Sequence, residues 1–148
     1  MVQGRPVSAV PTAARCYLAV EYRSTDGRPR RDVAMSIHLN TLFGAPLSLV
    51  NTHMLNQDFA AAPARGIIRF EIPRLPLTAG RYTVDLNLAT HAGHNYADFI
   101  RSAAAFDVVD GDFYGTGRPG NPGAPVMLDG RWHLVEAAGE TGPLPSSP

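Results

Sequence analysis

A glycine-rich stretch at residues 115–120 is the first pattern in this sequence that could do chemistry. It reads Gly-Thr-Gly-Arg-Pro-Gly, which matches the G-x-G-x-x-G pattern of dinucleotide-binding loops, and it follows a predicted strand. In such a loop the glycines open a helix whose N-terminus meets the pyrophosphate. Pro119, Pro122 and Pro125 are incompatible with that helix, because proline lacks the backbone donor and clashes with the preceding turn. We therefore predict a flexible linker over residues 111–125 and no cofactor.

A second pattern has the spacing of metal ligands. His91, His94 and Asp98 are close enough in the chain to share an ion, but the sequence offers no evident fourth ligand. They fall in a polar stretch, for which a solvated loop is the better interpretation. We predict no metal site.

Groups suited to catalysis are also few. The sequence contains no G-x-S-x-G nucleophile elbow, and its one cysteine, Cys16, lies in the middle of a predicted strand as a small buried hydrophobic residue. Asp85 and Asp107 could form a carboxylate pair across neighbouring strands. On the flat outer face of a sheet nothing would desolvate them or separate their pKa values, so acid–base catalysis is not expected. The sequence therefore argues against an enzyme.

Polar side chains on the outward side of three predicted strands suggest carbohydrate binding instead. If the strands that begin near residues 15, 81 and 104 are neighbours, these side chains share one exposed surface. A glycan needs such groups, because its hydroxyls pair with carboxylates and amides while its C–H faces stack on an aromatic ring. The candidate residues are Tyr17, Glu21, Thr83, Asp85, Asn87 and Asp107. The alternative is that they are the ordinary polar surface of a sheet.

Period-2 alternation of apolar and polar residues defines the strands that position these side chains. In the first of them, Cys16, Leu18, Val20 and Tyr22 form the inner side. In the strand at residues 33–40 the apolar side is Val33, Met35, Ile37 and Leu39, opposite Ala34, Ser36, His38 and Asn40. In the strand at residues 81–88 it is Tyr82, Val84, Leu86 and Leu88, opposite Arg81, Thr83, Asp85 and Asn87. We predict strands at residues 15–23, 33–40, 47–52, 67–72, 81–88, 104–109 and 126–135. Residues 53–65 are predicted to be an irregular connection, and residues 89–102 to hold one short helical turn.

Residues 77–82, Leu-Thr-Ala-Gly-Arg-Tyr, predict a tyrosine corner, in which the phenol of Tyr82 hydrogen-bonds to the backbone upstream. About seven to eight short strands with turn signals between them, together with this corner, predict an all-β fold. Specifically, we predict an immunoglobulin-like antiparallel β-sandwich.

Composition sets limits on the partners of this domain. The 148 residues carry 13 basic and 13 acidic side chains, so no basic field exists to attract nucleic acid or anionic lipid. No stretch resembles a signal peptide or a membrane span, which leads us to expect a cytosolic setting. We expect one sandwich domain over residues 1–135 and a disordered tail over residues 136–148.

The stretch from the corner to residue 118 resembles a known family. The segments R-L-P-L-T-A-G-R-Y-T-V-D-L-N-L, D-F-I and A-A-A-F-D-V-V-D-G-D-F-Y-G-T-G-R are similar to the C-terminal domain of Wzt-type ABC transporter ATP-binding subunits, the O-antigen exporters of Gram-negative bacteria. The similarity covers roughly residues 4–132, including the L-A-V-E-Y and I-H-L-N strands. Its most specific parts are residues 77–82 and 106–117.

This resemblance implies a sandwich that binds the end of a finished, lipid-linked polysaccharide at the cytoplasmic face of the inner membrane and admits it to export. Such domains are typically dimeric, carry no catalytic activity and need no cofactor. They usually follow an ATPase domain in the transporter subunit. The 148 residues contain no G-x-x-x-x-G-K-[ST] motif, so ATP hydrolysis is expected from that parent subunit.

The leading hypothesis is therefore a non-catalytic carbohydrate-binding module for polysaccharide export. The main alternative is an immunoglobulin-like protein-interaction or structural module, and a more distant one is a hydrolase or lyase on a sandwich scaffold. A homodimer is also expected. The linker at residues 111–125 would let the last predicted strand pair with its own sheet or with a partner's, by exchange between protomers.

Overall fold

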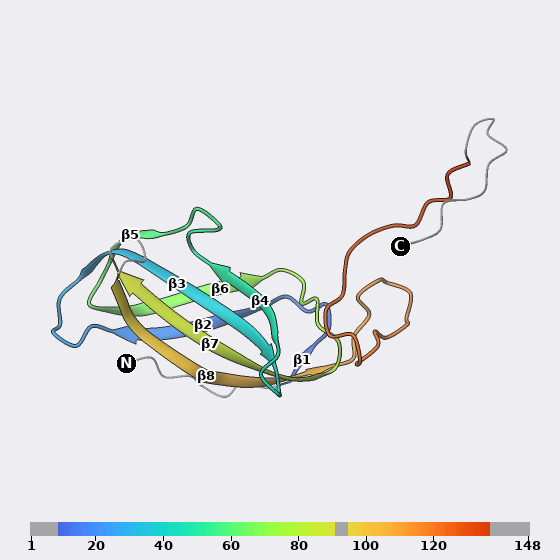
Figure 1. Cartoon of the computed structure of the whole chain (residues 1–148), viewed down its shortest axis with the longest axis horizontal. Helices are drawn as coiled ribbons and strands as arrows, with labels where there is room; N and C mark the ends of the chain where they lie inside the picture. Colours follow the sequence, from blue (N-terminus) through green and yellow to red (C-terminus); the bar gives the residue numbers. More distant parts are fainter. Residues whose placement is uncertain (1–8, 91–94, 137–148) are drawn as a thin grey trace.

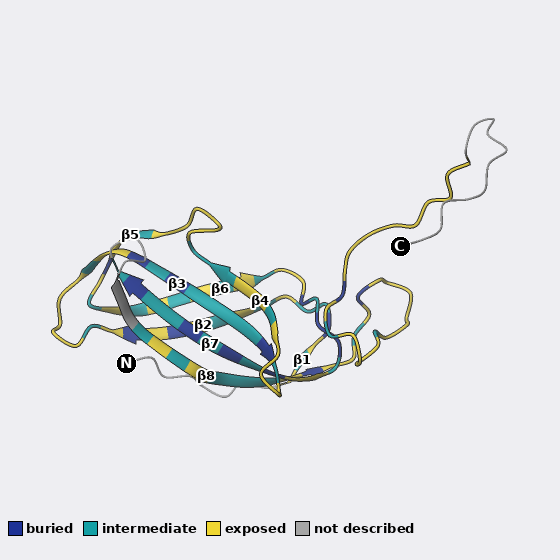
Figure 2. Ribbon diagram, viewed as in Figure 1, coloured by how far each residue is buried: buried dark blue, intermediate teal, exposed yellow. Residues whose placement is uncertain are grey.

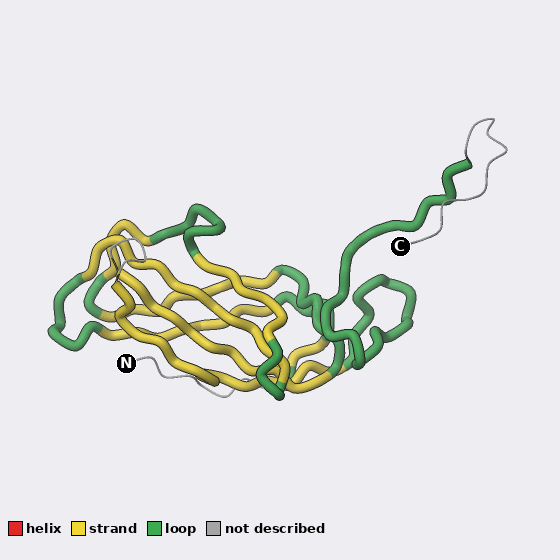
Figure 3. Tube along the Cα trace, in the orientation of Figure 1, coloured by secondary structure: helices red, strands yellow, loops and turns green. Residues whose placement is uncertain are grey.

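Two β-sheets pack face to face in the computed structural model, which describes residues 9–90 and 95–136 (Figure 1). Within these residues the chain forms strands, turns and loops, and no helix (Figure 3). The strands are β1 (Val10–Pro11), β2 (Cys16–Arg23), β3 (Arg30–Thr41), β4 (Pro46–Asn51), β5 (Phe59–Ala62), β6 (Arg65–Ile72), β7 (Gly80–Thr90) and β8 (Asn95–Val109). The predicted all-β sandwich is thus confirmed. Its strand pairs are antiparallel, apart from the short β1 beside β8.

The two sheets differ in size. The large sheet has the order β1–β8–β7–β3–β4, and β5 pairs with the first residues of β3. Within the described residues the small sheet consists of β2 and β6, paired in unbroken register from Cys16↔Ile72 to Arg23↔Arg65. Two strands therefore face a sheet that is more than twice as wide.

Alternating apolar side chains from both sheets form the core between them. Val20 of β2, Met35 of β3, and Val84 and Leu86 of β7 are buried together. Burying a side chain of this size contributes about 1.5–3 kcal/mol, so the alternation along each strand decides which side faces inward. The predicted inner sides of β2, β3 and β7 are confirmed.

Tyr82 forms the predicted tyrosine corner. Its hydroxyl donates a hydrogen bond to the Thr78 carbonyl oxygen at 2.7 Å, and its ring is buried. Leu75 and Leu77, in the loop just before it, are the most completely buried large side chains among the described residues. The bond fixes the chain where it passes from β6 in the small sheet to β7 in the large sheet.

Two segments predicted to lack strands contain them. The helical turn predicted within residues 89–102 is wrong, because β7 runs on to Thr90 and β8 begins at Asn95, pairing with β7 as a long hairpin. One turn of helix has little stability of its own, so the hydrogen bonds of the hairpin override it. The connection predicted at residues 53–65 includes β5, which has the weak local signal Phe-Ala-Ala-Ala and depends on pairing with β3.

Residues 111–125 are not the flexible linker that their Gly and Pro content predicts. The Thr78 amide donates to the Pro125 carbonyl at 2.9 Å, and buried Met127 donates its amide to the Pro76 carbonyl at 2.8 Å. Arg74 also holds this segment in place, because its guanidinium lies 3.7 Å from the centroid of the Phe113 ring. It also pairs with Asp129 at 3.1 Å. The segment is thus fixed against the corner by its few apolar side chains.

The strand predicted at residues 126–135 is not formed within the described residues. Val126 makes an isolated bridge to Leu77, and every residue from Leu128 to Glu136 is exposed (Figure 2). The segment leads away from the sandwich (Figure 1). Its alternation predicts a strand, but a strand needs a neighbour for its backbone hydrogen bonds. Residues 137–148, most of the predicted tail, lie outside the described residues.

Candidate functional site

The six predicted site residues lie on two opposite faces of the sandwich. Tyr17 and Glu21 project from the outward side of β2, in the small sheet. The other four, Thr83, Asp85, Asn87 and Asp107, lie on the outward side of the large sheet. The predicted neighbourhood of β2 and β7 is therefore wrong, since β7 lies between β3 and β8 while β2 pairs with β6. Alternation shows which side chains share a side of one strand, but not which strands are adjacent.

We call the outward side of the large sheet the outer face. Cross-strand register places Ser36 opposite Asn87 and His38 opposite Asp85 on it, and Asn87 opposite Phe99. The outer face includes Ser36, His38 and Asn40 of β3, Thr83, Asp85 and Asn87 of β7, and Phe99, Arg101 and Asp107 of β8.

Asp85 holds an irregularity in β8. Register passes from Val84↔Ala104 to Leu86↔Ile100, so three residues of β8 lie against one residue of β7. One carboxylate oxygen of Asp85 accepts the Ser102 amide at 2.7 Å, and the other accepts Asn40 Nδ2 at 3.1 Å. Such a bulge leaves backbone amides without a hydrogen-bond partner in the neighbouring strand. Asp85 supplies the acceptor for one of them, the Ser102 amide. Its role in the structure is therefore to brace the outer face.

Asp107 and Thr83 lie toward one end of the outer face. Both oxygens of Asp107 are 3.1 Å from the same guanidinium nitrogen of Arg81, in a half-exposed ion pair. The Thr83 hydroxyl is 3.5 Å from the Thr41 carbonyl oxygen. The carboxylate pair suggested by the sequence is not formed, because Asp85 and Asp107 each bind other groups.

The centre of the outer face carries an aromatic pair that the sequence analysis missed. The rings of His38 and Phe99 meet edge to face, with centroids 6.3 Å apart and an interplanar angle of 86°. Arg101 lies 5.9 Å from the Phe99 centroid. The alternation of β3 already placed His38 on its outward side, whereas Phe99 was assigned to a helical turn that does not form.

Asn87 carries an unusual polar atom beside this pair. Its Oδ1 is buried and has no hydrogen-bond partner among the described residues. Buried side-chain oxygens are nearly always paired in folded proteins, so an exception calls for an explanation.

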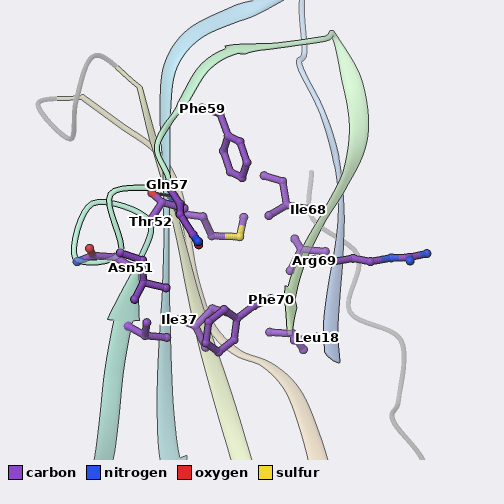
Figure 4. Close-up of a pocket in the computed structure, with 13 residues that line it drawn as sticks. Leu18, Ile37, Asn51, Thr52, Gln57, Phe59, Ile68, Arg69 and Phe70 are labelled. Atoms are coloured by element: carbon purple, nitrogen blue, oxygen red, sulfur yellow. Dashed lines mark hydrogen bonds between the residues drawn. The ribbon is translucent and has the colours of Figure 1, made fainter. Parts of the chain in front are cut away.

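A cleft of about 210 Å³ opens between the sheets, below the loop that joins β4 to β5. Figure 4 shows Phe59 and Phe70 pointing into it, and Arg69 pointing away. Its apolar lining comes from both sheets and the loop: Leu18, Val20, Met35, Ile37, Val50, Leu55, Phe59, Ile68 and Phe70. The cleft arises because the small sheet ends at β6 while the large sheet continues to β4.

Other chemistries find little support in the described residues. These residues contain no group of three His, Cys, Asp or Glu side chains placed to hold a metal, and His91 and His94 lie outside them. Burial raises the pKa of the Cys16 thiol, which disfavours a reactive thiolate. No helix in the described part of the chain is long and apolar enough to cross a membrane.

The glycine pattern at residues 115–120 forms a turn filled by the chain's own carboxylate. Gly115 and Gly117 adopt positive φ, and the amides of Thr116 and Gly117 both donate to Asp112 at 2.9 Å. Asp112 therefore accounts for the glycines without a nucleotide.

Comparison with known proteins agrees with this fold. A family model described as the Wzt C-terminal domain matches residues 1–119. A crystal structure of the C-terminal domain of Wzt is similar with a TM-score of 0.66 and 10% sequence identity, over 86% of this chain and 74% of that one. No curated protein matches the sequence. The resemblance carried by residues 77–82 and 106–117 is confirmed, and the chain belongs to the Wzt C-terminal domain family, a family of O-antigen transporter domains.

Proposed function

We propose that this domain is a non-catalytic carbohydrate-binding module that recognises the end of a lipid-linked O-antigen polysaccharide for export by an ABC transporter. In this proposal it needs no cofactor and acts at the cytoplasmic face of the inner membrane, beside the ATPase and membrane subunits. The observation that carries the proposal is the His38–Phe99 pair at the centre of a polar sheet face.

The chemistry of the outer face suits a sugar. Phe99 is 49% exposed, so its ring offers a surface on which the C–H face of a pyranose can stack. Around it lie amide and hydroxyl groups that can pair with sugar hydroxyls, chiefly Asn87 and Ser36. The bulge braced by Asp85 sets the position of this part of β8. Thr83 and Asp107 would lie at the rim of the site.

Tyr17 and Glu21 are not part of this proposed site. Tyr17 is exposed on the small sheet, and the Arg69 guanidinium lies 5.0 Å from its ring centroid. Because the outward sides of the two sheets point away from each other, one sugar cannot contact both. Tyr17 therefore provides a matched aromatic control for Phe99.

The alternative, an immunoglobulin-like protein-interaction module, is favoured by one feature of the surface. Phe43 is 95% exposed at the tip of the β3–β4 hairpin, next to half-exposed Leu42. Adjacent exposed apolar side chains on a tight turn are typical of contact sites for another protein. Glycan binding at the outer face would be independent of this tip, so Phe43→Ala should leave it unchanged.

The proposed homodimer forms by exchange of the C-terminal segment. Trp132 and Leu134 are fully or nearly fully exposed, although both are apolar. Among the described residues β6 has one unpaired edge, with no proline or bulge to protect it, and this edge borders the apolar cleft. Residues 130–136 of one protomer would pair with β6 of its partner and place apolar side chains in the cleft.

Calorimetric titration with O-polysaccharides of differing non-reducing ends tests the function. We expect one of them, such as the polysaccharide of the organism that encodes this chain, to bind. Phe99→Ala should abolish that binding, whereas Tyr17→Ala should retain it. Absence of binding to every polysaccharide would count against the function, and loss of binding only in Tyr17→Ala would move the site to the small sheet.

A further inference from the structure

His38 and Phe99 meet above β7, although neither belongs to that strand. His38 lies on β3 and Phe99 on β8, on either side of β7. Neighbouring strands are about 4.8 Å apart, so these two strands are separated by roughly 10 Å. The ring centroids are nevertheless only 6.3 Å apart. Both rings must therefore lean inward over β7.

The two side chains of β7 beneath this pair differ in their hydrogen bonding. Register places His38 opposite Asp85 and Phe99 opposite Asn87. Both oxygens of Asp85 already accept hydrogen bonds, from Ser102 and from Asn40. The buried Oδ1 of Asn87 accepts none from the described residues. An unpaired acceptor therefore lies under an aromatic cover.

We infer that the rings of His38 and Phe99 cover Asn87 and can move apart. When the rings separate, Asn87 Oδ1 accepts a hydrogen bond from a ligand hydroxyl. The inference rests on the proposed carbohydrate function and assigns the residue that selects the sugar. Phe99 has room to move because about half of its surface is exposed, and its polar neighbour Arg101 is exposed as well. In the bound state the sugar ring stacks on Phe99 with one hydroxyl turned toward β7.

This geometry restricts the chemical group that reaches the floor of the site. Asn87 Oδ1 is an acceptor only, and the neighbouring Asp85 is saturated and acidic. A deprotonated carboxylate or a fully ionised phosphate brings no donor and would meet like charge. The group selected at Asn87 is therefore a hydroxyl, or the N–H of an acetamido group.

Asn87→Leu tests the inference, with Glu21→Leu on the outward side of the small sheet as the control. The probes are the O-polysaccharide that binds in calorimetry and the methyl glycoside of its terminal sugar, intact and deoxygenated at one position at a time. We expect Asn87→Leu to weaken binding about 10-fold, as for loss of one well-placed hydrogen bond. Glu21→Leu should change it less than twofold. One deoxy position should weaken binding to the wild-type chain and have no further effect on Asn87→Leu.

A second measurement needs no ligand. Replacing an unpaired acceptor beneath two rings with leucine removes a buried polar atom, so Asn87→Leu should raise the thermal unfolding midpoint. A lowered midpoint would show that Oδ1 is already paired in the free chain, and would overturn the inference. Unchanged glycan affinity in Asn87→Leu would overturn it too, while leaving the proposed function intact. If no glycan binds the wild-type chain, the function fails and the selective role of Asn87 fails with it, whatever the midpoint.

Discussion

The carboxylate of Asp85 accepts the backbone amide of Ser102 at 2.7 Å, across 17 residues of the chain. Ser102 has a φ of 48°, in the left-handed region, at the centre of the segment of β8 that bulges against β7. Phe99 and Arg101 lie just before this point. A carboxylate on one strand thus sets the position of the aromatic ring on the next.

Removing that carboxylate should lower the stability of the fold. Asp85→Ala leaves the amides of Ser102 and Asn40 without their acceptor, and we expect a loss of about 1.5–3 kcal/mol in the free energy of unfolding. Asp107→Ala breaks only the half-exposed pair with Arg81 and should cost less than about 1 kcal/mol. Urea denaturation of both variants makes the comparison. Equal losses would show that Asp85 does not brace the bulge.

The tyrosine corner predicts a second pair of variants. Tyr82→Phe removes the hydroxyl that binds the Thr78 carbonyl and leaves a buried acceptor unpaired, which should cost about 1–2 kcal/mol. Tyr17→Phe removes a hydroxyl from an exposed ring and should be neutral. Chemical denaturation of the two variants should therefore separate them, and a neutral Tyr82→Phe would contradict the role given to the corner.

Acid should weaken the contribution that Asp58, in the loop between β4 and β5, makes to the stability of the fold. A hydrogen bond from Thr52, which has the larger effect, and one from His53 lower the pKa of Asp58 below its ordinary value of 3.8. A carboxyl group whose folded pKa is depressed stabilises the fold above its unfolded pKa, and this contribution is lost as pH falls through the folded pKa. The stability advantage of the wild-type chain over Asp58→Asn should therefore shrink below about pH 4. Denaturation curves of both chains across this range measure it, and an advantage that grows toward acid would refute the assignment.

The proposed exchange of the C-terminal segment makes a dimer, which predicts the oligomeric state of the chain in solution. Trp132→Ser removes the largest apolar side chain of the segment from residue 130 onward, and it should convert the dimer to a monomer without lowering the stability of the sandwich, because Trp132 is fully exposed in this structure. Light scattering over a range of concentrations distinguishes the two states. A wild-type chain that stays monomeric at high concentration would rule out the exchange.

Local patterns in the sequence were sufficient for the strands and the corner, but not for their arrangement. The inner sides of β2 and β7 follow from alternation alone, and Tyr82 follows from a short motif. The adjacency of β2 to β6 depends on long-range pairing that no local pattern records. The aromatic pair was missed for the same reason, since His38 and Phe99 meet only when β3 and β8 flank β7. The packing of residues 111–127 depends on Phe113 and Met127, which are too few to mark a Gly- and Pro-rich segment as ordered.

We propose that the outer face binds the end of the polysaccharide. NMR titration of the isotopically labelled chain with the polysaccharide that binds in calorimetry locates the binding surface. We predict shifts in the backbone amides of β3, β7 and β8 around His38, Asn87 and Phe99, with β2 and β6 unaffected. Shifts confined to β2 and β6, around Tyr17, would contradict the claim.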